Sequence, residues 1–181
     1  YDPDRSRGVA TYSGGARKDS TFEEFKKAAK GLIAALRSTQ GKGLRFLDCG
    51  TSGGVWGLEN GYALMVGGDA ANVAKVQPAF DTLKPEGESG FVHAGPVGAG
   101  HFAKMVHNGI EYGLMQAYAE GYELLEKKDI VENVPGAFKA WSRGTVVRSW
   151  LLDLMVKALE ENPGLQDVSD YTTDSGEGRW T

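Results

Sequence analysis

The hydrophobic pattern of the chain changes near Gly95–Gly100, and this change constrains the fold more than any other feature. Before it, short apolar runs predict buried strands at residues 44–48, 62–66 and 91–93. Between the last two runs, Asp69 can cap a predicted helix over Ala70–Leu83, which Pro78 can kink. Strand, helix and strand in this order predict a parallel sheet covered by helices.

After the change, almost the whole chain has a helical pattern. Ala99–Lys127 and Val146–Glu160 are the strongest segments, and Thr21–Arg37 predicts a further helix near the beginning. We assign packing roles to Trp141, Arg148 and Trp150, and the arginine, placed inside an apolar helix, needs a partner. The predicted fold is a mixed α/β part over residues 1–95, followed by an all-α domain over residues 96–181.

Composition excludes several classes of function. The 181 residues are 41% hydrophobic and carry a net charge of −4, which gives no global attraction to nucleic acid or to an anionic membrane. No apolar run approaches the roughly 20 residues that span a bilayer. The single cysteine, Cys49, excludes an internal disulfide framework and favours a reducing compartment. We therefore expect a cytoplasmic protein.

A first glycine cluster, Asp48–Gly54, follows the first predicted strand. In a parallel sheet, the loop after the carboxyl end of a strand is where ligands bind. Ser52 offers a hydroxyl group, and Gly53 and Gly54 allow backbone N–H groups to approach an anion. A tight turn that needs positive φ explains the same residues equally well. Trp56, just beyond, suits a packing or lid role.

A second cluster, Gly95–Gly100, has its glycines in the spacing GxxGxG, which is the reverse of a dinucleotide-binding fingerprint. We expect these glycines to let the next helix begin close to another backbone. That helix places five polar side chains on one face, at spacings of three, four, seven and eight residues from the first. They are Lys104, His107, Asn108, Glu111 and Tyr112.

This polar stripe has a structural and a catalytic interpretation. A solvated helix face with a glutamate–lysine pair is common, but histidine, asparagine and tyrosine are unusual on one. Lys104 can act as a base if burial or a cationic neighbour lowers its pKa. Glu111, if desolvated, can stay protonated and act as an acid. The pattern alone leaves both interpretations open.

The segments FLDCGTSGGVWGLENGYALMVGGD and GPVGAGHFAKMVHNGIEYGLMQAYAEGYELL resemble the decarboxylating 6-phosphogluconate dehydrogenases. WSRGTVVRSWLLDL and DSGEGRWT resemble later blocks of the same family, in its short bacterial form. The family oxidises 6-phosphogluconate at C3 with NADP or NAD and releases carbon dioxide, giving ribulose 5-phosphate. The resemblance also implies that residues 1–95 are the α/β remnant of a Rossmann-type nucleotide-binding domain that lacks its GxGxxG portion. It implies a homodimer or homotetramer as well.

The resemblance implies a role for each matching residue. Lys104 would take the proton of the 3-hydroxyl and return one to the carbonyl oxygen, and Glu111 would protonate C1 of the enediol. No metal is implied, because the C3 carbonyl serves as the electron sink. The remaining matches would bind substrate: the hydroxyl and carboxylate region through His107 and Asn108, the carboxylate through Ser52, Gly53 and Gly54, and the phosphate through Tyr112.

The chain also departs from the family. It has no GxGxxG motif, and only Gly14 and Gly15 can be carried over to the cofactor. Ser175 and Glu177 stand in the last Gly-rich turn, where longer members carry a phosphate-binding lysine. We therefore expect a fragment that is inactive alone.

Two other functions remain as alternatives. A β-hydroxyacid dehydrogenase of the 3-hydroxyisobutyrate type shares the Ser-Gly-Gly loop and the lysine–asparagine pair, but its simple oxidation needs no equivalent of Glu111. A non-catalytic helical module would instead use Ala99–Lys127 and Val146–Glu160 to form a dimer face.

Overall fold

The computed structural model describes residues 44–128 and 130–169, and these divide into two compact units that meet in sequence at His101 and Phe102. The helix predicted over Thr21–Arg37, the glycines Gly14 and Gly15, and the turn with Ser175 and Glu177 lie outside the described residues. Each unit is therefore considered by itself. Within the described part, no helix is long and apolar enough to cross a membrane.

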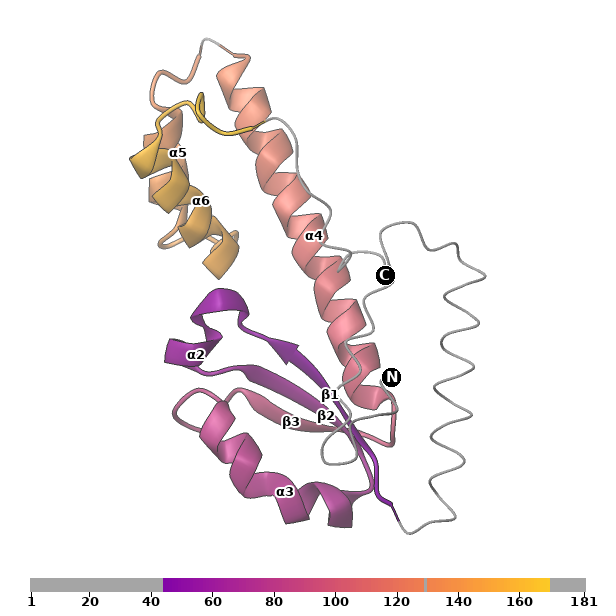
Figure 1. The fold of residues 1–181 in the computed structure, drawn as a ribbon. Coiled ribbons are helices and arrows are strands. Elements are labelled where there is room, and N and C mark those ends of the chain that lie inside the picture. Colours follow the sequence, from indigo (N-terminus) through magenta and orange to yellow (C-terminus); the bar gives the residue numbers. More distant parts are fainter. Residues whose placement is uncertain (1–43, 129, 170–181) are drawn as a thin grey trace, which may run out of the picture. The chain divides into compact units, whose positions relative to one another are not determined.

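The described part of the first unit is a three-stranded sheet with a helix against it (Figure 1). Its strands are β1 (Leu47–Ser52), β2 (Ala63–Gly68) and β3 (Phe91–Gly95), in the spatial order β1-β2-β3. A 3₁₀ turn, η1 (Gly54–Trp56), and the short helix α2 (Gly57–Asn60) connect β1 to β2. Helix α3 (Ala70–Leu83) connects β2 to β3 and has the predicted bounds.

Helix α3 covers the sheet because of its cap and its apolar face. The Asp69 side chain accepts hydrogen bonds from the N–H groups of Ala71 and Asn72, which satisfies the first turn. Val73 is buried with Leu64 and Val66 of β2 in the core of this unit. The same helix packs an aromatic ring on β3, where the Phe80 and Phe91 centroids lie 5.4 Å apart.

The sheet corrects the prediction of purely parallel strands. β2 and β3 are parallel, as expected for strands joined through a helix, but β1 pairs antiparallel to β2. The short β1–β2 connection explains this, since a parallel crossover needs about a dozen residues or more. The carboxyl end of β1 therefore lies at the amino end of β2. The Ser52 loop is thus not at the carboxyl edge of a parallel sheet, where ligands were expected to bind.

The first strand is also longer and later than the predicted Leu44–Asp48. Its ladder with β2 extends from the pair Leu47–Gly68 to the pair Ser52–Ala63. Leu47 and Cys49 pack against the core of the unit, whereas Leu44 and Phe46 are exposed. Pairing with a neighbouring strand thus overrides the local apolar run that suggested the earlier bounds.

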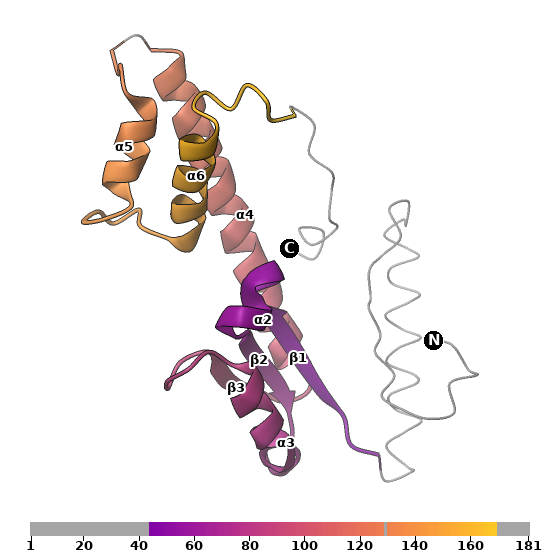
Figure 2. The same cartoon turned by 60° about the vertical axis from the view of Figure 1, so that its left-hand side comes forward.

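The second unit is helical and is built from α4 (Ala99–Glu126), which begins in the first unit, α5 (Val134–Trp141) and α6 (Trp150–Glu161). Figures 1 and 2 both show α5 and α6 side by side. The core of this unit is Phe138 and Val134 of α5 with Leu152 and Leu159 of α6, and Tyr118, Tyr122 and Leu125 of α4 pack against it.

The long α4 was predicted correctly, but the last helix begins four residues later than the predicted Val146. Ser149 has extended backbone angles, and its hydroxyl accepts a hydrogen bond from the Leu152 N–H at 3.0 Å. This cap starts α6 at Trp150. Arg148 therefore lies outside the helix and is exposed, which corrects its placement in an apolar helix.

Candidate active site

Four side chains of the predicted stripe come together on one face of α4. His107 is three residues after Lys104 and four before Glu111, so these side chains meet across a helical turn, and Asn108 adjoins His107. The Nζ atom of Lys104 lies 3.2 Å from Nδ1 of His107, and the same Nδ1 lies 3.2 Å from Oδ1 of Asn108. The carboxylate Oε2 of Glu111 lies 3.6 Å from it as well. A lysine, an imidazole and a carboxyl group thus form a continuous row.

Nδ1 of His107 cannot accept a hydrogen bond from Lys104 and donate one to Asn108 or Glu111 at the same time. Nδ1 carries either a lone pair, which can accept from the Lys104 ammonium, or a proton, which it can donate to Asn108 or Glu111. The presence or absence of a proton on Nδ1 therefore decides which contact of the imidazole is satisfied. The arrangement can hold a proton at any of three positions along the row.

Burial differs along this row. Asn108 is only 5% exposed, so its amide is held in place, while the side chains of His107 and Glu111 are 43% and 33% exposed. Tyr112 follows Glu111 on the helix and is exposed. The stripe is thus buried and fixed in position at Asn108, and it is accessible to a polar ligand at His107, Glu111 and Tyr112.

The second group of predicted residues lies in the other unit, at the end of β1. Ser52 is the last residue of the strand, and Gly53 and Gly54 lead into η1. Gly54 has φ +54°, a left-handed conformation that side chains disfavour, and a Cβ on Gly53 would lie 3.0 Å from the Tyr62 ring. The tight-turn interpretation of these glycines is therefore correct, and the ligand role stays a prediction.

The second glycine cluster lets α4 begin against the sheet, as predicted. A Cβ on Gly100 would lie 2.2 Å from the carbonyl oxygen of Met65. The amides of this first turn are not free for a phosphate, because the buried Asp48 carboxylate accepts from Gly98 at 2.5 Å and from His101 at 2.8 Å. These glycines thus provide a close approach between backbones.

This role of Asp48 was not predicted from the sequence, in which the residue marks the end of a strand and the start of a glycine cluster. The residue lies inside β1 and is 3% exposed. A carboxylate among small and apolar strand residues was the available signal, since a buried charge requires partners. Beside it, burial raises the pKa of the Cys49 thiol; the Thr51 hydroxyl lowers this pKa to a smaller degree, and the charge of Asp48 adds to the rise.

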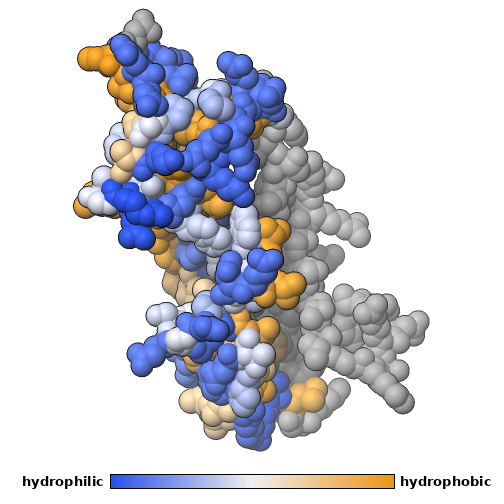
Figure 3. Space-filling model, turned by 90° about the vertical axis from the view of Figure 1, so that its left-hand side faces the viewer, coloured by the Kyte–Doolittle hydropathy of each residue, from blue (hydrophilic) through white to orange (hydrophobic). Residues whose placement is uncertain are grey.

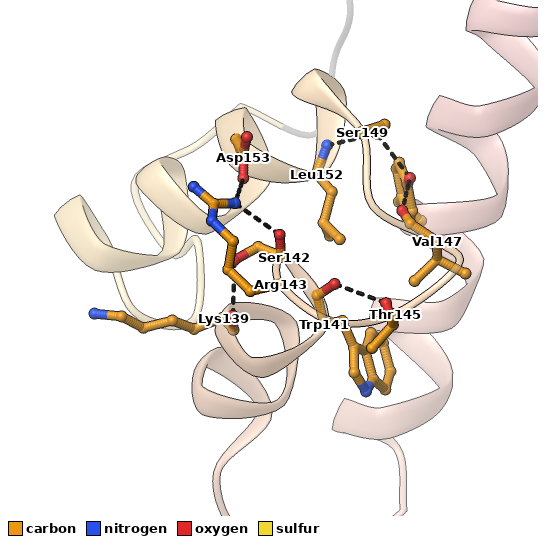
Figure 4. A network of polar contacts seen from close by, with 10 residues as sticks. Lys139, Trp141, Ser142, Arg143, Thr145, Val147, Ser149, Leu152 and Asp153 are labelled. Carbon is orange, nitrogen blue, oxygen red and sulfur yellow. Dashed lines mark hydrogen bonds and ion pairs between the residues drawn. The ribbon is translucent and has the colours of Figure 1, made fainter.

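A network of polar contacts shapes the α5–α6 connection (Figure 4). Arg143 donates to the Asp153 carboxylate at 2.8 Å and to the Ser142 carbonyl at 2.6 Å.

Trp141 packs on Phe138 with ring centroids 5.0 Å apart, which agrees with its predicted packing role. On the face drawn in Figure 3, apolar side chains reach the surface between polar ones.

The described residues hold neither a metal-binding cluster of three or more His, Cys, Asp or Glu side chains nor a Gly-rich turn in the GxGxxG spacing. The glycines predicted to contact a cofactor, Gly14 and Gly15, lie outside this part of the chain. The described residues thus do not form a recognisable pyrophosphate loop.

Comparison with known proteins identifies two family models along the chain. The NAD binding domain of 6-phosphogluconate dehydrogenase matches residues 20–87, and the 6-phosphogluconate dehydrogenase C-terminal domain matches residues 100–181. The matches assign the chain to the dehydrogenases that join an NAD-binding domain to a helical one. Within that class, the chain belongs to the 6-phosphogluconate dehydrogenase family.

Individual relatives agree with this assignment. The NAD⁺-dependent decarboxylating 6-phosphogluconate dehydrogenase of Haloferax volcanii is 43% identical over 90% of this chain and 51% of its own length. The decarboxylating 6-phosphogluconate dehydrogenase of Bacillus licheniformis is 36% identical over 80% of this chain and 33% of its own. This chain spans about half the length of the Haloferax volcanii enzyme and of a putative 6-phosphogluconate dehydrogenase of Bacillus subtilis.

A solved structure shows the same architecture. The 6-phosphogluconate dehydrogenase of Plasmodium falciparum, studied in its apo form and in complex with NADP⁺ and with 6-phosphogluconate, superimposes with a TM-score of 0.71 at 28% identity. The match covers 81% of this chain and 33% of that one. The Rossmann-type α/β unit followed by a helical unit is therefore confirmed as the fold class.

Proposed function

We propose that this chain carries the proton-transfer residues of a decarboxylating 6-phosphogluconate dehydrogenase. The observation that carries the proposal is the row on α4, in which His107 Nδ1 contacts both Lys104 Nζ at 3.2 Å and Glu111 Oε2 at 3.6 Å. A base and an acid on one helix face suit a reaction that removes a proton from one carbon's hydroxyl and adds a proton to the neighbouring carbon.

The reaction would convert 6-phosphogluconate to ribulose 5-phosphate and carbon dioxide. Lys104 takes the proton of the 3-hydroxyl as C3 is oxidised, and it returns a proton to the C3 oxygen as the carboxylate leaves. Glu111 then protonates the enediol at the carbon that becomes C1 of ribulose 5-phosphate. Bound NADP or NAD supplies the hydride acceptor, in line with the NAD⁺-dependent relative and with the NADP⁺ complex of the structural neighbour.

The other predicted residues would hold the substrate. His107 and Asn108 lie beside the base and the acid, where they can bind the hydroxyl and carboxylate region of a sugar acid. Tyr112, on the accessible rim of the same helix, would contact the phosphate group. We assign the carboxylate to Ser52, Gly53 and Gly54 on the family resemblance.

The test measures reduction of NAD and NADP with 6-phosphogluconate, together with release of carbon dioxide. It uses the full chain, alone and joined to the part of the 43%-identical relative that this chain does not match. We expect turnover from the joined protein only. Lys104→Ala and Glu111→Gln should each lower the rate by about a hundredfold or more, because each removes a proton-transfer group.

Matched substitutions at the other end of α4 control for general effects. Lys127→Ala and Glu120→Gln change exposed residues of the same types and should leave the rate unchanged. Turnover of a simple hydroxy acid without carbon dioxide release would instead support a β-hydroxyacid dehydrogenase. No turnover of either substrate by the joined protein would leave the helical dimer module as the better explanation.

A further inference from the structure

The proposed reaction leaves its two proton-transfer groups in the wrong states for a second cycle. Before turnover, Lys104 must be a neutral amine and Glu111 a protonated acid. Glu111 gives its proton to C1, and Lys104 ends with the proton of the former 3-hydroxyl once the enediol becomes a ketone. The cycle therefore ends with an ammonium and a carboxylate. One proton must move from Lys104 to Glu111 before the next substrate reacts.

We propose that Nδ1 of His107 carries this proton from Lys104 to Glu111, an inference that rests on the proposed function. The nitrogen lies 3.2 Å from Nζ of Lys104 and 3.6 Å from Oε2 of Glu111, so it faces both groups. An N–H bond of Lys104 breaks as one forms at Nδ1. That bond then breaks as an O–H bond forms on Glu111, and the proton on Nε2 stays in place.

The neighbourhood of His107 suits a relay through one nitrogen. Asn108 is buried, and its Oδ1 lies 3.2 Å from Nδ1, so it can accept from that nitrogen while the nitrogen carries the proton. An amide does not titrate, so it accepts this hydrogen bond without offering another site for the proton. Imidazole can both accept and release a proton, so the ring can carry one between the two groups.

Solvent offers a second, slower route for the same proton. The side chains of His107 and Glu111 are 43% and 33% exposed, so water and buffer molecules can reach both. Without the imidazole, Lys104 must release its proton to the medium and Glu111 must recover one from it. The two routes differ in a measurable way, because only the solvent route depends on buffer concentration.

The experiment compares the first turnover with the steady state in the joined, active enzyme. His107→Asn keeps a hydrogen-bonding atom near the position of Nδ1 but cannot carry a proton. Because His107 is also assigned to the substrate, the first turnover is measured at saturating substrate, and we expect it to fall clearly less than the steady-state rate of the variant. Its steady-state rate should fall by roughly tenfold to a hundredfold, and it should rise again with imidazole concentration.

His101→Asn is the matched control, since it changes an exposed histidine of the same helix and should alter neither phase. Equal loss in the first turnover and the steady state, without rescue by imidazole, would assign His107 to substrate binding and overturn the relay. An unchanged steady state would overturn it too. Absence of 6-phosphogluconate decarboxylation in the parent, or full activity of Lys104→Ala, would instead remove the proposed function and the relay with it.

Discussion

The carboxylate of Asp48 accepts a hydrogen bond from the backbone N–H of His101 at 2.8 Å, across 53 residues of sequence. The same carboxylate accepts from Gly98, so one buried side chain satisfies two amides at the beginning of α4. It thereby ties the first turn of the helix to the beginning of β1. Lys104 follows His101 by three residues on the same helix, so this cap orders the turn from which the polar row begins.

Replacement of Asp48 by alanine should lower the free energy of unfolding by about 1–3 kcal/mol, because two partly buried amides lose their acceptor. Urea denaturation of the full chain measures this loss, and hydrogen exchange at Gly98 and His101 should accelerate. Asp81→Ala, at an exposed carboxylate of α3, is the control, and it should cost about 0.5 kcal/mol or less. Equal effects of the two substitutions would contradict a capping role for Asp48.

The parts of the site that were predictable from sequence are those set by helical periodicity. The row of Lys104, His107, Asn108 and Glu111 follows from spacing along one helix, and the structure brings these four side chains together. The bounds of α3 follow from its Asp69 cap and its apolar face. Both features depend on residues within a few positions of one another, which local sequence reports directly.

The features that sequence did not reveal depend on distant pairing. The antiparallel direction of β1 is set by its ladder with β2, and the role of Asp48 is set by a helix that begins some 50 residues later. The predicted start of α6 was wrong for a different reason, which is local. Val146 and Val147 continue the apolar pattern of the helix, but the extended backbone and hydroxyl cap of Ser149 begin the helix only at Trp150.

Two glycines of α4 should respond to alanine in opposite directions. A Cβ on Gly100 would lie 2.2 Å from the Met65 carbonyl oxygen and 2.9 Å from the Gly67 nitrogen, both backbone atoms that can move little. Gly100→Ala should therefore lower the free energy of unfolding by about 1–3 kcal/mol. Gly121 has open space around it, so Gly121→Ala should raise this free energy by about 0.5–1 kcal/mol through helix propensity. Thermal unfolding of both variants checks the signs, and a loss at both would contradict the close approach as the cause.

The contact between Tyr118 and Ser149 should couple α4 to the start of α6. The Tyr118 hydroxyl donates to the Val147 carbonyl at 2.7 Å and lies 2.8 Å from the Ser149 hydroxyl, which itself accepts from the Leu152 N–H. Since the tyrosine proton is used, Ser149 donates to Tyr118, and each hydroxyl has a defined direction. Tyr118→Phe should cost about 1 kcal/mol and Ser149→Ala about 1–2 kcal/mol of unfolding free energy.

A double-mutant cycle measures this coupling, with chemical denaturation of the parent, both single variants and the double variant. Because the two substitutions remove the same hydrogen bond, their sum should exceed the effect of the double substitution by about 0.5–1 kcal/mol. Tyr62→Phe combined with Ser149→Ala is the control, since Tyr62 belongs to the core of the other unit, and these effects should add. Additive behaviour of Tyr118 and Ser149 would show that each hydroxyl contributes only through its backbone partner. Coupling would instead establish that the side-chain contact itself holds the α5–α6 connection against α4.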